Sequence, residues 1–105
     1  MNKEEAIKKI EQAGFTLENE HENYDRFVKE YKPNKTHHYS QNQVVKVELD
    51  LNYDEDEEGN IIVDSVEWDA SIKSYEFLDE DDIDELTELL EEAKDECQEL
   101  AGEVE

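Results

Sequence analysis

Carboxylates are the side chains of this sequence that could carry chemistry. Aspartate and glutamate make up 33 of the 105 residues, lysine and arginine only 10, and the formal net charge is −23. Paired carboxylates catalyse glycoside hydrolysis only where a sheltered cleft raises the pKa of one of them, and a chain this short leaves little room for a cleft. The sequence contains no glycine-rich phosphate loop, no GxSxG nucleophile motif and no zinc-ligand spacing. We therefore expect a protein that is not an enzyme and uses no cofactor.

The other reactive side chains are one cysteine and three histidines. A single cysteine excludes an internal disulfide, and Cys97 occupies an apolar position of a helical pattern, so we expect a buried thiol rather than a nucleophile. His37 and His38 are neighbours in the aperiodic stretch 33–42, and adjacent side chains on an extended chain point apart. We expect solvated loop histidines there and no dedicated metal ligands.

One acidic segment, 54–61, resembles the first eight positions of an EF-hand calcium loop, with Gly59 at the sixth position. The twelfth position, which is normally a bidentate glutamate, is Ser65. Both flanks alternate as strands do, whereas an EF-hand needs helices. The segment is better explained as a hairpin turn in which Gly59 takes a positive φ. A calcium-binding module remains an alternative function.

The strongest helical pattern lies near the end of the sequence. Its apolar residues stand alternately three and four apart, which is typical of one helix face. These residues are Ile83, Leu86, Leu90, Ala93, Cys97, Leu100 and Val104. Asp79 is the expected N-cap, Leu78 and Ile83 have the spacing of a hydrophobic staple, and Gly102 is the expected end of the helix.

The other faces of this helix carry almost only carboxylates. Between positions 79 and 103 there are thirteen acids and one base, Lys94. Eight pairs of acids stand four residues apart, and at ~0.2–0.5 kcal/mol each their repulsion sums to roughly 2–4 kcal/mol. Because a typical domain is stable by about 5–15 kcal/mol, this is a large cost for a surface helix. We infer that these residues were selected for something other than stability.

A short helix is predicted at the start of the chain, over 2–13. Asn2 and Glu5 have the spacing of a capping box, and Gly14 provides the exit. Its inner face consists of Ala6, Ile7, Ile10 and Ala13. This helix is amphipathic and should pack on the same core as the C-terminal helix.

Two strands are predicted after this helix. A short strand begins at 15–17, and a polar turn covers 19–23. The second strand covers 24–32 and places Phe27 and Tyr31 on one side.

A longer hairpin follows the loop at 33–42. Residues 45–53 alternate strictly between apolar and polar side chains, and a partner strand runs from 61 to about 77. The apolar residues at the start of the partner strand are out of phase with the later ones, which predicts a β-bulge near 63–65.

These elements predict a single α+β domain over residues 1–105. It consists of a short N-terminal helix, an antiparallel meander of three to four strands, and a long acidic C-terminal helix packed on one sheet face. The helices should cover the face that bears Val47, Leu49 and Trp68.

The opposite sheet face should be acidic. If Val47 lies opposite Trp68, then Glu48 lies opposite Glu67 on the open face, and like charges directly across a ladder are destabilising. The open face, the 54–58 turn and the outer face of the last helix would then all be acidic.

The negative charge is confined to one part of the chain. Residues 1–47 hold eight acids and eight bases, whereas residues 48–105 hold twenty-five acids and two bases. We expect such a chain to be repelled by nucleic acids and anionic membranes and attracted to basic protein surfaces. The sequence shows neither a secretory signal nor an apolar run that could span a bilayer, so we expect a cytoplasmic protein.

Thirteen carboxylates over about 25 residues, at ~1.5 Å of rise per residue, give roughly one charge per 3 Å of helix axis. One strand of B-DNA carries one charge per ~3.4 Å of axis, so the two densities are similar. A rigid scaffold with this density can occupy a channel lined by lysine and arginine in place of nucleic acid.

In size, acidity and lack of catalytic motifs, the chain resembles the small acidic DNA-mimic inhibitors of phages and mobile elements, which include several anti-CRISPR proteins. The runs DEDEE and DEDDIDEL carry this resemblance. It implies an inhibitor that blocks DNA or guide binding by an RNA-guided nuclease in the host cytoplasm, with no direct binding of nucleic acid. The candidate contact residues are Asp54, Asp56, Glu57, Glu58, Glu67, Asp69, Asp84, Glu88, Glu91, Glu92, Asp95 and Glu99.

A different class of function also fits the pattern of the last helix. Its apolar stripe has the spacing of a coiled-coil seam over about three heptads, so the chain could be an acidic adaptor or assembly protein that dimerises through this helix. The same stripe is needed to cover the sheet of the monomer. Both a monomer and a homodimer remain open.

Overall fold

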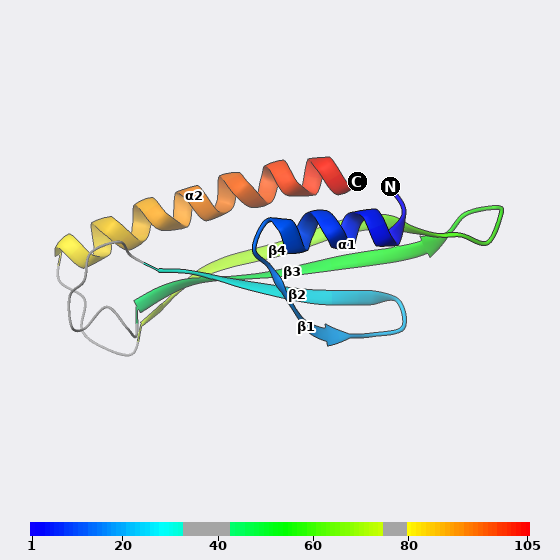
Figure 1. Ribbon diagram of the computed structural model, residues 1–105. Coiled ribbons are helices and arrows are strands. Elements are labelled where there is room, and N and C mark those ends of the chain that lie inside the picture. Colours follow the sequence, from blue (N-terminus) through cyan, green and yellow to red (C-terminus); the bar gives the residue numbers. More distant parts are fainter. Residues whose placement is uncertain (33–42, 75–79) are drawn as a thin grey trace.

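The computed structural model describes residues 1–32, 43–74 and 80–105. They form a four-stranded antiparallel sheet in the order β1-β2-β3-β4, with two helices on one of its faces (Figure 1). The elements are α1 (Lys3–Gln12), β1 (Thr16–Glu20), β2 (Tyr24–Tyr31), β3 (Gln43–Glu55), β4 (Ile61–Ser74) and α2 (Glu80–Val104). The predicted α+β meander is therefore confirmed. The predicted loop at 33–42, the N-cap Asp79 and the staple residue Leu78 lie outside the described residues.

The local signals of α1 act as predicted. The side-chain oxygen of Asn2 accepts a hydrogen bond from the backbone N–H of Glu5 at 2.8 Å, which satisfies one of the free donors of the first turn. Gly14 follows the helix with a φ of +95°, a conformation that residues with a Cβ rarely adopt. Ala6 and Ile10 are fully buried on the inner face.

The first hairpin has a longer β1 and a shorter turn than the sequence predicts. β1 continues to Glu20, so that the turn occupies only 21–23, where His21 stacks on the ring of Tyr24 with centroids 4.2 Å apart. All residues of β1 are exposed. An edge strand that buries no side chain has no hydrophobic alternation, and its pairing with β2 alone defines its end.

The register of the second hairpin differs from the predicted one by two residues. Leu49, not Val47, lies opposite Trp68, so Glu48 faces Asp69 and Asp50 faces Glu67. A shift of two residues leaves every side chain on its own face, which is why the alternation could not distinguish the two registers.

The predicted bulge is confirmed and helps to set this register. Asn52 pairs with Ser65 and Tyr53 pairs with Val63, which leaves Asp64 as the extra residue of β4. Beyond it, Gly59 has a φ of +84° in the connecting turn, as predicted.

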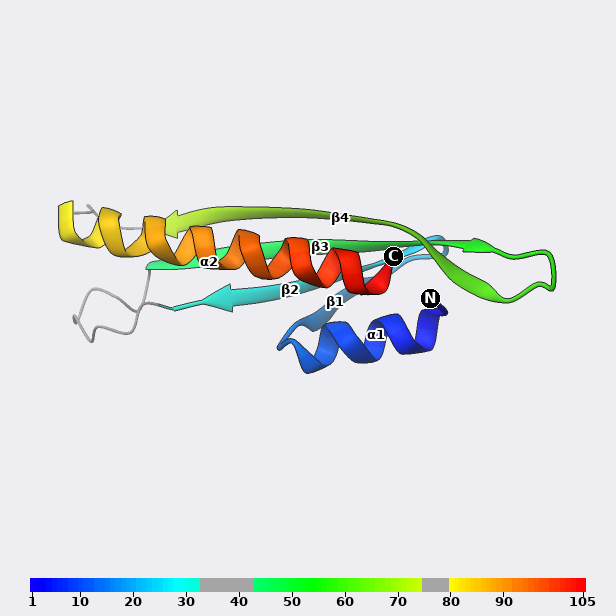
Figure 2. The same ribbon diagram turned by 90° about the horizontal axis from the view of Figure 1, so that it is seen from above.

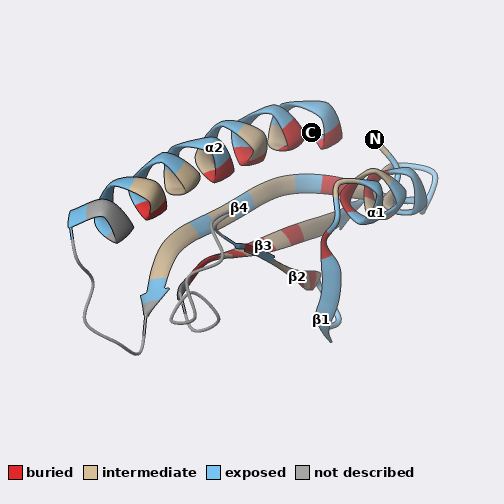
Figure 3. Ribbon diagram, turned by 60° about the vertical axis from the view of Figure 1, so that its left-hand side comes forward, coloured by how far each residue is buried: buried red, intermediate tan, exposed pale blue. Residues whose placement is uncertain are grey.

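The core lies between β3 and the two helices (Figure 3). Val45, Val47, Leu49 and Leu51 of β3 are fully buried, together with Phe27 of β2. On α2 the buried residues are Leu86, Ala93, Cys97, Leu100 and Val104, which confirms most of the predicted inner face.

Ile83 is the exception on that face, because 46% of it is exposed. The first turn of α2 extends past the ends of the described strands (Figures 1 and 2), so Ile83 has little sheet beneath it. Its predicted inward position is wrong.

Gly102 does not end α2, as the sequence predicted, because the helix continues through it to Val104. The low helix propensity of glycine favours an end at Gly102. Val104 is fully buried, and the free energy gained by this burial favours continuing the helix to Val104. Nothing lies within 4 Å of a Cβ built on Gly102.

Gly102→Ala is therefore expected to raise the free energy of unfolding by about 0.5–1 kcal/mol, the usual gain in an exposed helix interior. Gly59→Ala is the matched control and should lower it by about 1–2 kcal/mol, because Gly59 has a positive φ. Urea unfolding followed by circular dichroism measures both. A loss of stability in Gly102→Ala would mean that α2 ends at this residue.

The molecule is elongated. Its extents are 55 × 22 × 18 Å and its radius of gyration is 15.9 Å, against about 13 Å for a compact domain of this length. The long strands of the second hairpin and the 25-residue α2 run along the same axis (Figure 2). No helix in the described ranges is both long and apolar enough to cross a lipid bilayer.

Candidate acidic interaction surface

The exposed carboxylates of α2 form one continuous stripe, which we call the acidic ridge. Its members are Glu80, Asp84, Glu88, Glu91, Glu92, Asp95, Glu99 and Glu103. At about 100° per residue, these positions point away from the buried side chains of the same helix. From Asp84 to Glu103 the ridge is roughly 28 Å long at ~1.5 Å of rise per residue. All six contact residues predicted on this helix belong to it.

The hairpin tip holds a second group of acids, at one end of the molecule (Figure 1). Asp54, Glu57 and Glu58 are exposed there. Asp56 is different, because its carboxylate accepts hydrogen bonds from the backbone N–H groups of Glu58 and Asn60, each at 2.9 Å. These bonds, above all the one from Asn60, lower the pKa of Asp56. Asp56 therefore builds the turn, which is the hairpin explanation of the EF-hand likeness.

Glu67 and Asp69 lie on the open face of the sheet, opposite the face that α2 covers. The structure thus divides the twelve predicted contact residues among three places: the acidic ridge, the hairpin tip and the open sheet face. A flat partner surface cannot touch the ridge and the open face together, because the sheet lies between them.

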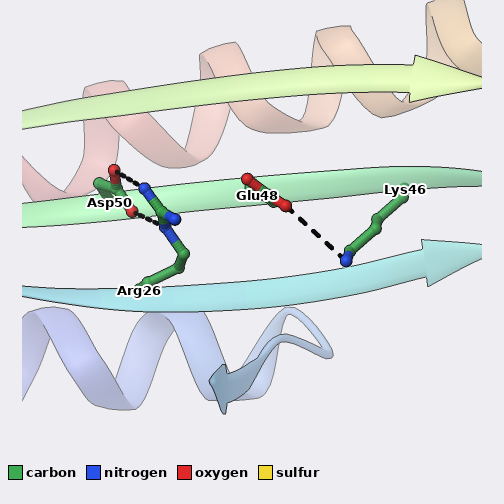
Figure 4. Close-up of polar contacts among 4 residues, drawn as sticks. All are labelled: Arg26, Lys46, Glu48 and Asp50. Carbon is green, nitrogen blue, oxygen red and sulfur yellow. Dashed lines mark hydrogen bonds and ion pairs between the residues drawn. The ribbon is translucent and has the colours of Figure 1, made fainter. Parts of the chain in front are cut away.

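The open face is not uniformly acidic, which corrects the expectation from the sequence. Arg26 of β2 donates two hydrogen bonds to the carboxylate of Asp50, at 2.8 and 3.0 Å, and Lys46 lies 3.7 Å from Glu48 (Figure 4). The Asp50 carboxylate raises the pKa of Arg26 above its ordinary value. Both bases come from the charge-balanced residues 1–47: Arg26 is on β2, which pairs with β3, and Lys46 is on β3 itself.

The sheet order turns the charge asymmetry of the sequence into an asymmetry in space. Because the strands follow one another in the order β1-β2-β3-β4, the acidic part of the chain remains on one side. α2 packs over β3 and β4, so the acidic ridge lies along that side as well (Figure 2). The acidic ridge and the acidic strands β3 and β4 therefore lie on the same side of the described part of the chain.

A lysine at the junction of the helices and the sheet is a residue that the sequence analysis missed. The ammonium group of Lys29 donates to the carbonyl of Ala13 at 2.7 Å and to the carboxylate of Glu96 at 2.7 Å. It also lies 4.5 Å from the centre of the Tyr31 ring. Lys29 thereby joins the end of α1, the middle of α2 and β2. The sequence did contain a signal for its inward position, because Lys29 alternates along the strand with Phe27 and Tyr31 and so lies on the same face.

A buried carboxylate on the inner face was missed in the same way. Asp25 is 3% exposed and accepts a hydrogen bond from the hydroxyl of Tyr53 at 2.5 Å. Burial, and then this bond, raise the pKa of Tyr53 above its ordinary range. Lys3 of α1 lies 4.8 Å above the Tyr53 ring, so the pair connects α1 to the sheet. These contacts give the pair a structural role.

Cys97 is fully buried, as predicted, and burial raises the pKa of its thiol from 9.0 to about 11, with the nearby Glu96 carboxylate adding to the rise. Between pH 9 and 11 the unfolded chain releases a proton that the folded chain keeps. Stability that is complete below pH 9 is therefore lost as pH rises through this window, by roughly 2–3 kcal/mol.

We expect this loss in urea unfolding as the difference between wild type and Cys97→Ala, which lacks the thiol. Native protein at pH 8 should also react with iodoacetamide far more slowly than protein unfolded in urea. Equal alkylation rates in the two states would show that the thiol is accessible.

Over residues 1–32, 43–74 and 80–105, histidine, cysteine, aspartate and glutamate side chains form no group of three or more that could hold a metal ion. Comparisons with protein families, with curated proteins and with solved structures find no match for this chain.

Proposed function

We propose that this protein is a non-enzymatic mimic of DNA, which inhibits a basic nucleic-acid-binding protein of a host-defence system in the cytoplasm. The best candidate partner is an RNA-guided nuclease, whose binding of DNA or guide RNA it would block. The observation that carries the proposal is the acidic ridge, a single row of exposed carboxylates along a rigid helix.

The charge density of the whole molecule supports this. At one charge per ~1.7 Å, a 55 Å length of B-DNA carries roughly 32 phosphate charges. This chain carries a net charge of −23 over the same length. A channel that neutralises phosphates with lysine and arginine gains counterion-release free energy from such a surface as it does from DNA.

The free-energy cost of the repulsion within the acidic ridge also supports the proposal. In the folded state the acids of the acidic ridge stand side by side on exposed positions, with Lys94 as the helix's one base. Their repulsion destabilises the free protein and is relieved when a positively charged surface covers them. Solubility alone needs a net charge of only about 2–8 for a small domain.

The alternatives have no such support. The apolar stripe of α2 that could form a dimer seam is already packed on the sheet from Leu86 to Val104. The carboxylate of Asp56, in the segment that resembles a calcium loop, is engaged by the backbone of its own turn. Neither an adaptor that dimerises through α2 nor a calcium-binding module is favoured by a specific contact.

Competition with DNA tests the proposal. A panel of purified bacterial RNA-guided nucleases, each loaded with its guide, is mixed with a fluorescent duplex target, and this protein is titrated in. With its partner, the protein should displace the duplex at a one-to-one ratio, and its affinity should fall steeply with added salt. A ternary complex of nuclease, duplex and this protein would refute mimicry.

A further inference from the structure

β4 is an edge strand with a long free side. In the described part of the chain it pairs with β3 from Ile61 to Ser74. Its other side is paired with backbone only near its start, where Asn2 forms a bridge with Ile62 and the carbonyl of Met1 accepts a hydrogen bond from the N–H of Val63 at 3.0 Å. An edge of this length presents a row of backbone N–H and C=O groups that can pair with another strand.

One contact shows which of these groups point outward. The backbone N–H of Val66 donates to the side chain of Glu105 at 3.1 Å, so it faces away from β3. Because backbone orientation repeats every second residue, the N–H and C=O groups of Trp68, Ala70 and Ile72 point to the free side as well. Glu105 occupies the edge only at Val66.

The inner face of the sheet is incompletely covered at this strand. Val45, Val47 and Leu49 of β3 are fully buried, whereas their neighbours Ile72, Ala70 and Trp68 on β4 remain partly exposed (Figure 3). One further strand beside β4 would bury these side chains as β4 buries those of β3.

The flank of α2 above this edge is less acidic than the acidic ridge. Glu96 reaches Lys29 of β2 and Glu105 reaches Val66 of β4, so these two contacts identify the two flanks of the helix. At about 100° per residue, the flank that shares the direction of Glu105 carries Ile83, Thr87, Leu90, Lys94 and Ala101. Glu80 and Glu91 of the acidic ridge lie at its outer border. On this flank Ile83 is exposed and Leu90 is partly exposed.

We propose that the free edge from Trp68 to Ile72 binds an extended, basic segment of the partner protein as an added β-strand. Alternate side chains of this segment are apolar and lie under this flank of α2. The intervening ones are lysine or arginine and lie beside Glu67 and Asp69 on the open face. The inference rests on the proposed function in one respect, since it assigns this segment to the same basic partner.

A second copy of this chain suits the edge less well. It would bring two molecules of net charge −23 side by side and place their long acidic helices next to each other. Acids on an edge strand are one of the means by which proteins prevent such self-pairing.

A synthetic peptide that alternates lysine and valine, KVKVKVK, is the probe for the wild-type protein, with binding measured by fluorescence anisotropy. In an added strand that runs antiparallel to β4, as all strands of this sheet run to their neighbours, the valine N–H groups face β4 and the lysine N–H groups face solvent. N-methylation of the valine amides should weaken binding by at least about 10-fold, whereas N-methylation of the lysine amides should leave it nearly unchanged. Equal binding of the two methylated peptides, or no binding of the parent peptide, would overturn the proposal.

The protein side is tested with Ala70→Pro, because proline is tolerated on the solvent side of an edge strand but removes the outward N–H. It should lose peptide binding, while Ala70→Thr, which keeps that N–H, should retain it. A dimer in sedimentation equilibrium that Ala70→Pro abolishes would assign the edge to a second copy and contradict the proposal. A variant with a neutralised ridge should still bind the peptide while losing competition with DNA, so a failure of mimicry and a failure of edge docking are distinguishable.

Discussion

A variant with four ridge carboxylates neutralised is expected to unfold at a higher temperature than wild type in low salt, yet to bind its partner about 100-fold more weakly. The substitutions are Glu88→Gln, Glu91→Gln, Glu92→Gln and Glu99→Gln. They remove six of the like-charged pairs four residues apart, and at ~0.2–0.5 kcal/mol per pair the gain in stability is about 1–3 kcal/mol. The loss of four exposed ion pairs, at ~0.7 kcal/mol each, accounts for the weaker binding.

Thermal unfolding at low and high salt and competition with the duplex target measure these two effects. Because salt screens the repulsion, the gain in stability should shrink at 1 M salt, where the Debye length is about 3 Å. The matched control neutralises four exposed acids on the charge-balanced side of the molecule: Glu11→Gln, Glu18→Gln, Glu20→Gln and Glu22→Gln. If both variants lose binding equally, net charge alone matters and the acidic ridge is not the contact surface.

Lys29→Ala is expected to lower the free energy of unfolding by about 2–3 kcal/mol, which corresponds to a fall of roughly 10 °C or more in the unfolding temperature. The substitution removes the bonds to the carbonyl of Ala13 and the carboxylate of Glu96. It also leaves the ring of Tyr31 without the cation above it. Since the lysine side chain is only 23% exposed, salt should reproduce little of this loss.

Two further variants calibrate this result. Glu96→Gln keeps an acceptor near the lysine and should cost less than about 1 kcal/mol. Lys94→Ala removes the one lysine of α2, which forms no ion pair with a described residue of the sheet. It should change stability by less than about 0.5 kcal/mol. If Lys29→Ala were as mild as Lys94→Ala, the junction between the helices and the sheet would have to be held by apolar packing alone.

The sequence predicted the elements whose patterns are local. The spacing of Leu86, Ala93 and Cys97 indicated the inner face of α2 because burial of one helix face requires it. The phase change before Val66 likewise indicated the bulge at Asp64, since one extra residue reverses the alternation of a strand. The acidic residues of the ridge were predicted to be exposed because they occupy the helix positions opposite this apolar face.

Contacts between distant segments were not predictable in this way. Arg26 and Asp50 are 24 residues apart, and Lys29 and Glu96 are 67 apart, so no local pattern relates them. The end of α2 was predicted wrongly at Gly102. The free energy gained by burying Val104 is larger than the cost of placing a glycine within the helix.

The sequence by itself determined the order of helices and strands, their buried faces and the concentration of acids in the second half, because periodicity and charge are properties of neighbouring residues. Only the tertiary structure decided where those acids lie. It separated the acidic ridge from Glu67 and Asp69 by the thickness of the sheet, and it placed Arg26 among the acids of the open face. It also left β4 at an edge with half-covered side chains, since register and strand order depend on pairing across the sheet and not on any single segment.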